Sequence, residues 1–347
     1  MKIKVICCLP IAGIENPYQS LMLQGLNTDS SIQAKNGVKS RFFGIFKTVK
    51  HSSPDYLHFD WITSYYERRR LWMTLVLLPL FYAQVLYVRY FTSTKIVWTL
   101  HNIDPHNANH LWLHRWVRRF FGRQCAWIRV FSDDSVGRAC TALNQSPAKF
   151  KVIPEGPYTA VYPNDLTQQV ARKKLNLAES QRVLLSLGYI KPYKGIENLI
   201  KTYAKLKPIN TSLVIAGNCL DIAYKHQLEA LLLAHPEVDI RLMASFIPPE
   251  ALQVYFNAAD AVVLPFDKVE NSGSAIMAMG FKKAILAPKM GVLKKRLVQQ
   301  NFLLYNSLEE GLNTIFAIDK NELEHIGQKN YASLQQHRWE DFALAFK

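Results

Sequence analysis

The chain has 347 residues, a length that fits two domains better than one. Hydrophobic residues make up 49% of it and charged residues 20%, which excludes a largely disordered protein. The 42 Lys and Arg against 27 Asp and Glu give a net charge of +15, which favours an anionic partner such as nucleic acid, acidic lipid or a phosphorylated substrate. The five cysteines include no Cys-x-x-Cys pair, so we expect reduced thiols in a reducing compartment.

Short β-branched runs alternate with helical stretches along the chain. The predicted strands of the first half are 3–9, 56–61, 95–100, 127–132 and 151–154. Those of the second half are 183–188, 212–217, 240–246, 261–266, 284–287 and 302–305. Such runs, separated by helices, indicate parallel sheets covered on both faces. Two series divided by a stretch rich in proline near 154–164 predict an α/β chain with two doubly wound, Rossmann-like domains.

The loop after the first predicted strand contains Gly13, Asn16 and Pro17. Asn16 and Pro17 are typical of a helix cap followed by the first helical position. The loop also lies where ligands bind in open parallel sheets, beyond the carboxyl ends of the strands. Capping is the favoured role, although the same residues can also contact a substrate.

An apolar run of 18 residues, 71–88, lies between three arginines at 68–70 and Arg89. Its length meets the lower bound for a membrane span. The predicted strands on either side of it should pair in one sheet, which a single span would prevent. We therefore favour a crossover helix whose outer face dips into lipid, helped by its basic flanks. A fully buried core helix is the second interpretation, and a membrane span the third.

Two histidines and a carboxylate follow the predicted strand 95–100: His101, Asp104 and His106. Side chains of these types at a strand's carboxyl end can supply a general base near neutral pH. Their spacing matches no recognised metal site. We favour His106 or Asp104 for direct catalysis, because His101 lies nearer the sheet, where we expect it to brace the loop through Asn102.

The preceding strand offers a second choice for the base. His58 and Asp60 stand at its carboxyl end. They are the next candidates should the three residues of the later loop not act.

The loop after strand 183–188 contains Gly188, Lys191 and Lys194, followed by a helical pattern from residue 196. The amino end of a helix and a lysine ammonium both favour a phosphate group. Lys191 adds a second cation. Gly217 ends the next predicted strand, at the same edge of the sheet. An ordinary strand–loop–helix turn with solvated lysines is the alternative interpretation.

A second cluster of this kind follows strand 261–266. It contains Glu270, Asn271, Ser272, Gly273 and Ser274, directly before an apolar helix. Its backbone N–H groups and hydroxyls suit a diphosphate or a ribose, and Glu270 can accept hydrogen bonds from sugar hydroxyls. A plain helix cap is the alternative. Because both clusters belong to the same half of the chain and both follow strands, the functional interpretation is favoured.

These residues together resemble glycosyltransferase family 4 and its bacterial exopolysaccharide relatives. The similarity lies in four segments: His-Asn-x-x-Pro-His at 101–106, the glycine–lysine–glycine loop at 188–195, the segment 256–265 and the ending Trp-Glu-Asp-Phe at 339–342. Two positions depart from the family. Tyr189 stands where relatives carry Arg, and Met277 and Ala278 stand where relatives carry a second Glu.

The resemblance implies a GT-B fold, in which two parallel sheets face each other across a cleft. Residues 1–160 would bind the acceptor on the side of Gly13 and Asn16, residues 161–328 would bind a nucleotide sugar, and 329–347 would form a helix that returns to the first domain. Lys194 would neutralise the donor diphosphate, and Glu270 would touch the donor.

The implied activity is transfer of a hexose from a GDP- or UDP-linked sugar to a lipid-linked or polysaccharide acceptor. The nucleotide sugar would be a co-substrate, with no other cofactor and no metal. We expect the protein in the cytoplasm, bound peripherally to the anionic inner face of the cell membrane.

Three other classes of protein are alternatives to a glycosyltransferase. An epimerase of the same fold, acting on free nucleotide sugar, is the nearest alternative. A basic protein that binds nucleic acid or membrane also fits the charge, but we find no recognised nucleic-acid module and expect no nucleic-acid partner. A dinucleotide oxidoreductase would need a Gly-x-Gly-x-x-Gly turn, which the sequence lacks.

Overall fold

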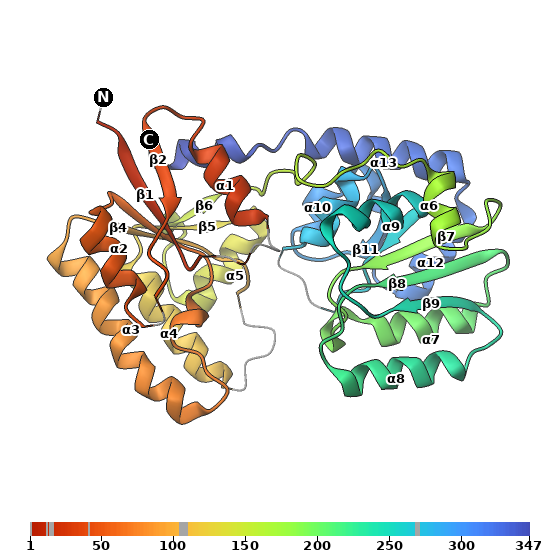
Figure 1. Ribbon diagram of the computed structural model, residues 1–347, viewed down its shortest axis with the longest axis horizontal. Coiled ribbons are helices and arrows are strands. Elements are labelled where there is room, and N and C mark those ends of the chain that lie inside the picture. The colour runs from red at the N-terminus through yellow and green to blue at the C-terminus, as the bar shows by residue number, and fades with distance from the viewer. Residues whose placement is uncertain (1, 12, 14–16, 41, 104–109, 268–270) are drawn as a thin grey trace. The chain divides into compact units, whose positions relative to one another are not determined.

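The computed structural model describes residues 2–11, 13, 17–40, 42–103, 110–267 and 271–347, and the chain divides into two units (Figure 1). Unit 1 comprises Met1–Glu155 and Arg338–Lys347, and unit 2 comprises Gly156–His337. The sequence placed the boundaries at 160 and 328. The expected last helix, 329–347, is in fact two helices, because α13 ends at Leu334 and a 3₁₀ helix, η6, begins at Trp339.

Unit 1 is built on a six-stranded parallel sheet in the order β2-β1-β3-β4-β5-β6. The strands are β1 (Lys4–Leu9), β2 (Ile32–Asn36), β3 (Tyr56–Phe59), β4 (Lys95–Thr99), β5 (Trp127–Val130) and β6 (Phe150–Val152). Only β2 was missed from the sequence. It is an edge strand in which Ile32 and Ala34 alone are buried, so it lacks the apolar run that marks the other strands.

The helices of unit 1 cover both faces of this sheet. They are α1 (Tyr18–Leu26), α2 (Gly44–Ser52), α3 (Leu71–Phe91), α4 (Leu111–Gln124), α5 (Asp133–Leu143) and the 3₁₀ helices η1 (Ile62–Tyr65), η2 (Pro147–Lys149) and η6 (Trp339–Phe346). In sequence order α2, α3, α4 and α5 pack one against the next, whereas α1 packs against η6. The contact between α1 and η6 is close, because a Cβ on Gly25 would lie 2.5 Å from the Trp339 side chain.

Helix α3 is the crossover between β3 and β4, as expected for the apolar run 71–88. Its buried residues include Leu78, Phe81, Val85 and Val88, which belong to the core beneath it. By length and composition α3 could cross a membrane, but only a third of its most apolar window is buried in the protein. Its outer face is therefore apolar and largely uncovered.

Unit 2 contains a second six-stranded parallel sheet, in the order β12-β11-β10-β7-β8-β9. Its strands are β7 (Arg182–Leu187), β8 (Thr211–Ala216), β9 (Asp239–Met243), β10 (Ala261–Val263), β11 (Ala284–Pro288) and β12 (Leu304–Tyr305). Every strand predicted for this half of the chain is present. The two parallel sheets confirm the prediction of two doubly wound, Rossmann-like domains.

The helices of unit 2 are α6 (Gln168–Lys174), α7 (Ile196–Leu206), α8 (Ile222–Leu233), α9 (Leu252–Ala258), α10 (Gly273–Gly280), α11 (Leu293–Arg296), α12 (Leu308–Ala317), α13 (Lys320–Leu334) and the 3₁₀ helices η3 (Pro192–Lys194), η4 (Pro249–Ala251) and η5 (Val298–Leu303). Helix α7 contacts α8 and α12, while α10 contacts α13. Except for the edge strand β9, whose residues are only partly buried, the strands between them are largely buried, as in parallel sheets covered on both faces.

Each sheet has one point where the strand order reverses. In unit 1 the chain passes from β1 outward to β2 and then returns to β3 on the other side of β1. In unit 2 it passes from β7 outward to β8 and β9 and returns to β10 on the other side of β7. Ligands in open α/β sheets bind beyond the carboxyl ends of the strands at such a point. Ligands are therefore expected at the loops after β1, β3, β7 and β10.

Candidate active site

The two predicted donor clusters lie at the switch point of unit 2. The loop 188–195 follows β7, and the segment 264–274 follows β10, its neighbour in the sheet. The clusters touch, because a Cβ built on Gly188 would lie 3.0 Å from the Oγ atom of Ser274. The structure thus brings together two segments that are about 80 residues apart in sequence, as parallel pairing requires.

Three glycines allow this edge of the sheet to close. Gly188 and Gly217 have φ angles of 138° and 142°, and a Cβ on Gly217 would lie 1.9 Å from the carbonyl oxygen of Gly188. Gly195 has φ 71°, and its Cβ would lie 1.9 Å from the carbonyl oxygen of Pro265. Side chains are excluded at these positions by both conformation and space. Gly217, predicted as a donor-site residue, therefore acts at least as a packing residue.

Lys194 is the main cation of this edge. It ends η3, and its ammonium lies 4.2 Å from the ring centre of Phe266, after β10. Burial, and to a smaller degree the charge of Lys191, lower the pKa of Lys194 to about 8. Among the residues that the structure describes, no carboxylate forms an ion pair with it. A partly desolvated cation of this kind favours an incoming anion.

The amino end of α10 faces the same edge. Ser272 is the N-cap of this helix, and its Oγ atom accepts a hydrogen bond from the N–H of Ala275 at 3.1 Å. The Ser272 hydroxyl therefore caps the helix, as in the alternative interpretation of this segment as a plain helix cap. Gly273 and Ser274 begin the first turn of α10. Asn271 is half-buried beside them. Glu270 lies outside the described residues, so its contact with the donor stays a prediction.

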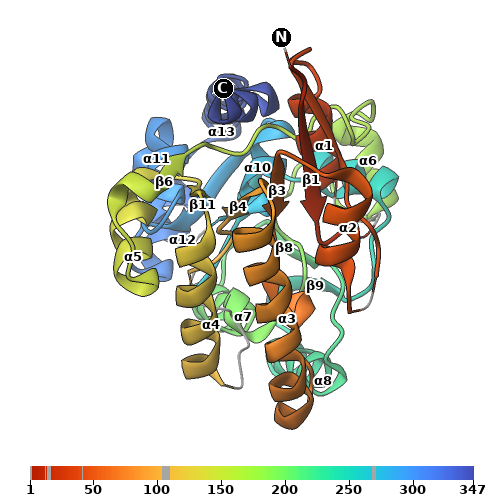
Figure 2. The ribbon, with the colours of Figure 1, turned by 90° about the vertical axis from the view of Figure 1, so that its left-hand side faces the viewer.

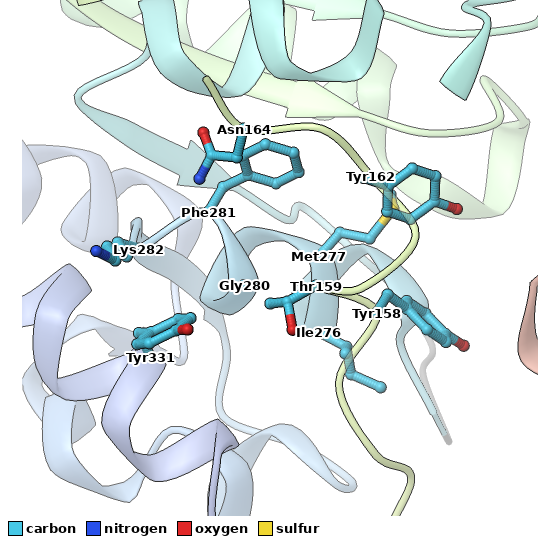
Figure 3. Close-up of a pocket in the computed structure, with 10 residues that line it drawn as sticks. All are labelled: Tyr158, Thr159, Tyr162, Asn164, Ile276, Met277, Gly280, Phe281, Lys282 and Tyr331. Carbon is cyan, nitrogen blue, oxygen red and sulfur yellow. The ribbon is translucent and has the colours of Figure 1, made fainter. Parts of the chain in front are cut away.

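Two hollows are found near these segments. The narrow one is lined by Gly188, Tyr189, Lys194 and Phe266 among others, and belongs to the predicted donor edge. The other, of about 220 Å³, lies between the segment 158–164, α10 and α13 (Figure 3). Its one cationic group is Lys282, whose ammonium lies 5.2 Å from the ring centre of Tyr331. None of the predicted donor residues within the described part of the chain lines this second hollow.

In unit 1, His101 lies two residues after the end of β4, next to the switch point, and it is half-buried. Its Nε2 atom lies 3.0 Å from Oδ1 of Asp60, which follows the neighbouring strand β3. The imidazole stacks on Trp61 with ring centres 4.7 Å apart and planes 17° apart. The side chain of Asp60 is completely buried, with 0% exposure. Asp60 was only a second choice from the sequence, because nothing in the sequence pairs it with His101.

Two further ionisable groups surround Asp60. His58 is buried on β3, where its Nε2 atom shares a 2.8 Å hydrogen bond with Thr99 and burial lowers its pKa to about 4. Arg129 of β5 is also buried and donates to the carbonyl oxygen of Ile153 at 2.9 Å. His58 is therefore neutral at physiological pH, and Arg129 is the permanent cation of the cluster.

The loop after His101 is described only as far as Ile103. Arg118 of α4 donates hydrogen bonds to the carbonyl oxygens of Asn102 and Ile103, the latter at 2.8 Å. We expected His101 to brace this loop through Asn102. Arg118 holds the loop instead, and the His101 side chain contacts Asp60. Asp104, His106 and Asn16 lie outside the described residues, and their roles stay predictions. Gly13 is exposed after β1.

Within the described part of the chain, no group of three or more His, Cys, Asp or Glu side chains is arranged to hold a metal ion.

Comparison with known proteins shows which family has these features. Residues 167–331 match the family described as glycosyl transferases group 1. The GDP-mannose:glycolipid 4-beta-D-mannosyltransferase of Xanthomonas campestris pv. campestris is 26% identical over 277 residues, which cover 79% of this chain and 70% of that protein. The chain is a GT-B glycosyltransferase. The family resemblance read from the sequence is thereby confirmed.

Other proteins are similar to the glycosyltransferase either over a shorter part of the chain or at a lower sequence identity. The lipopolysaccharide 1,2-N-acetylglucosaminetransferase of Salmonella typhimurium is 31% identical over 152 residues, covering 42% of this chain and 39% of that protein. Sucrose-phosphate synthase of Thermosynechococcus elongatus has a TM-score of 0.74 at 16% identity, covering 99% of this chain and 97% of that one. Anabaena HepE, in complex with UDP and glucose, has 0.73 at 16% identity, covering 99% and 98%. At such identities these structures establish the fold.

Proposed function

We propose that the glycosyltransferase moves mannose from GDP-mannose to a lipid-linked glycan in cell-surface glycan synthesis. The observation that carries this proposal is the similarity to the Xanthomonas mannosyltransferase. It extends over 277 residues, more than unit 2 contains, so it includes part of the acceptor-binding unit. The name of that relative specifies both GDP-mannose and a glycolipid. A UDP-linked sugar is the second candidate donor, because HepE of the same fold binds UDP.

The proposed stereochemistry follows from the same relative. The sugar of GDP-mannose is attached through its α anomeric bond, so a β-linked product requires inversion at the anomeric carbon. A single inverting displacement needs a side chain that takes the proton of the acceptor hydroxyl. We expect that base in unit 1.

Thermal shift with GDP-mannose, GDP, UDP-glucose and UDP-N-acetylglucosamine tests the donor. A donor at about 100 times its Kd should stabilise the fold by about 2.7 kcal/mol. Transfer of labelled mannose to a lipid-linked oligosaccharide, with the anomeric configuration of the product read by NMR, then tests the reaction. Stabilisation by UDP-sugars alone would overturn the GDP-mannose assignment. Turnover of GDP-mannose to another nucleotide sugar without acceptor would favour the epimerase.

We propose further that the reaction requires no metal ion. The leaving diphosphate gains negative charge as the sugar departs, and this charge must be stabilised. The proposal is supported by Lys194 and the amino end of α10, which lie at the predicted donor edge and can supply positive charge and N–H donors to the diphosphate. Full activity in excess EDTA is the expected result, and a loss restored by Mg²⁺ or Mn²⁺ would contradict it.

Finally, we propose that the enzyme is cytoplasmic and acts while bound peripherally to the inner face of the cell membrane. The support comes from exposed side chains on and next to two neighbouring helices of unit 1, which together are named here the aromatic–basic face. It consists of Trp72, Met73, Leu75 and Val76 on α3, Trp112 and Trp116 on α4, and the exposed arginines 69, 70, 115, 119 and 123. Helices α3 and α4 lie side by side (Figure 2) and are joined by the Tyr82 and Phe120 rings, 4.2 Å apart.

The composition of this face favours an anionic lipid surface as its partner. Trp112 and Trp116 are 65% and 58% exposed, and Trp72 is 57% exposed, although tryptophan is usually buried. Tryptophan beside arginine suits the boundary between lipid headgroups and acyl chains. Arginines near the surface attract anionic lipids by about 1 kcal/mol each. An anionic bilayer therefore satisfies both the apolar and the cationic side chains.

A further inference from the structure

The second hollow of unit 2, shown in Figure 3, is lined by residues that the proposed function does not use. It has a volume of about 220 Å³ and lies along the second half of α10, where Ile276, Met277 and Gly280 line it. The segment 158–164 forms one wall, and Tyr331 of α13 belongs to another. The hollow is therefore built from the first residues of unit 2, its central helix and its last helix.

The walls of this hollow are held in place by neighbouring elements. A Cβ on Gly327 would lie 1.9 Å from the carbonyl oxygen of Lys282, so α13 packs directly on the turn that follows α10. On the segment 158–164, Oδ1 of Asn164 accepts a hydrogen bond from Nδ2 of Asn257 on α9 at 2.8 Å. The hollow is thus preformed, and a ligand that enters it needs little ordering of the protein.

Several polar groups at the hollow have no hydrogen-bond or ion-pair partner among the residues that the structure describes. Nδ2 of Asn257 donates both to the Leu166 carbonyl oxygen and to Asn164, so the Asn164 atom that it meets must be the oxygen. The Nδ2 atom of Asn164 is then available as a donor. The hydroxyls of Tyr162 and Tyr331 and the ammonium of Lys282 are also available.

The composition of the hollow separates the classes of ligand that could fill it. None of the described residues that line it is acidic, so a metal ion or an amine meets no opposite charge. Lys282 is the one cation among them, and the carboxyl-terminal half of a helix carries partial negative charge, which disfavours a diphosphate. An acyl chain would cover the tyrosine hydroxyls and the Asn164 amide without bonding them, at a cost in free energy.

A pyranose ring fits this lining. Its faces consist of apolar C–H groups, and its rim carries hydroxyls that both donate and accept hydrogen bonds. In Figure 3 the Tyr331 ring lies on one side of the hollow and the Tyr158 and Tyr162 rings on the other. Tyrosine combines an apolar body with a polar tip, which matches the two surfaces of a sugar. The volume is below the range of about 300–1,000 Å³ for drug-sized ligands, so it suits a sugar ring better than a whole nucleotide.

We propose that this hollow is a second carbohydrate site, which binds one pyranose unit separately from the donor edge. Tyr162 and Tyr331 contact its apolar faces, and Lys282 and Asn164 donate hydrogen bonds to its hydroxyls. The inference goes beyond the proposed function and does not depend on it, because the whole lining belongs to unit 2 and no transfer is involved. The source of the pyranose is either a glycan chain or a free sugar.

Methyl NMR of the full chain with ¹³C-methyl methionine tests the site without a transfer assay. Met277 is half-buried in the lining, and Met277→Leu identifies its signal. Methyl α-mannoside, methyl α-glucoside and a mannose oligosaccharide are titrated in the presence of saturating GDP. At least one of them should shift the Met277 signal until it saturates, and inorganic phosphate should not. The absence of a saturable shift with all three, or a shift with phosphate alone, would overturn the proposal.

Lys282→Gly separates loss of the ligand from loss of the fold. Lys282 has a φ of 56°, a left-handed conformation that glycine adopts without strain, so the variant should unfold at about the wild-type temperature or above it. Removal of the charged donor should raise the Kd of the sugar about tenfold. An unchanged Kd in this variant would contradict the proposed site.

Lys207→Gly is the matched control. Lys207 is also an exposed lysine in the left-handed conformation, with a φ of 47°, but it caps the carboxyl end of α7 and does not line the hollow. Its replacement should leave the Kd of the sugar unchanged, and an equal loss in both variants would overturn the assignment. Tighter binding of the oligosaccharide than of the single sugars would identify a glycan chain as the source, and equal binding a free sugar.

Discussion

The ammonium of Lys194 lies 4.2 Å from the ring centre of Phe266, so the loop after β7 places its cation on the segment that follows β10. We predict that Lys194→Ala weakens GDP binding by about 1.5–3 kcal/mol, the range for a hydrogen bond to a charged group. Isothermal titration calorimetry with GDP measures the loss. Lys201→Ala is the control, because Lys201 is exposed on α7 and pairs with Glu197 at 2.5 Å. Equal affinity in the Lys194 variant and the wild type would remove Lys194 from the donor site.

The pH dependence of GDP binding provides a separate check on Lys194. Because burial lowers its pKa to about 8, the free protein loses this charge as the pH rises through that value. A bound diphosphate favours the protonated form, so GDP affinity should fall from about pH 7 to about pH 9.5. Lys194→Arg should extend tight binding to higher pH, since guanidinium stays charged. The same decline with pH in Lys194→Ala would show that another group is responsible.

Gly217 offers a prediction on stability. A Cβ at this position would lie 1.9 Å from the carbonyl oxygen of Gly188, and φ is 142°. Gly217→Ala should therefore lower the free energy of unfolding by about 1–3 kcal/mol or more and weaken GDP binding with it. Gly137→Ala, in the exposed middle of α5 with nothing within 4 Å, should instead be neutral or stabilise by up to about 1 kcal/mol. Urea unfolding compares the two variants, and equal losses would argue against a special role for the Gly188–Gly217 contact.

The aromatic–basic face predicts a specific pattern of membrane binding. Trp112→Ser with Trp116→Ser should strongly weaken binding to vesicles that contain anionic lipid, because two of the three exposed tryptophans of this face are lost. Binding of the wild type should weaken with salt, since headgroup attraction is screened. Vesicle flotation measures both effects.

Ile209→Ser is the control for that experiment. Ile209 is 93% exposed but belongs to unit 2, whereas the aromatic–basic face belongs to unit 1, so its replacement should leave vesicle binding unchanged. Retained binding in the double tryptophan variant, or equal binding to neutral and anionic vesicles, would contradict the proposal.

The sequence alone was sufficient for the fold class, and it also located the two strand-end loops that we predict to bind the donor. Eleven of the twelve strands were recognisable, because strands buried on both faces read as continuous apolar runs. Gly188, Lys191 and Lys194 could be singled out because glycine after such a strand permits a tight turn and lysine there can bind an anion. The edge strand β2 escaped because one of its faces is polar.

Tertiary structure alone decided which side chains meet. Asp60 and His101 are 41 residues apart, and their contact follows from the pairing of β3 with β4, which no local pattern specifies. The aromatic–basic face likewise needed the packing of α4 beside α3, since periodicity cannot tell which of two apolar faces the sheet will cover. Local sequence determines where strands and helices form through short-range propensity and burial, whereas a contact between distant side chains depends on long-range pairing of whole elements.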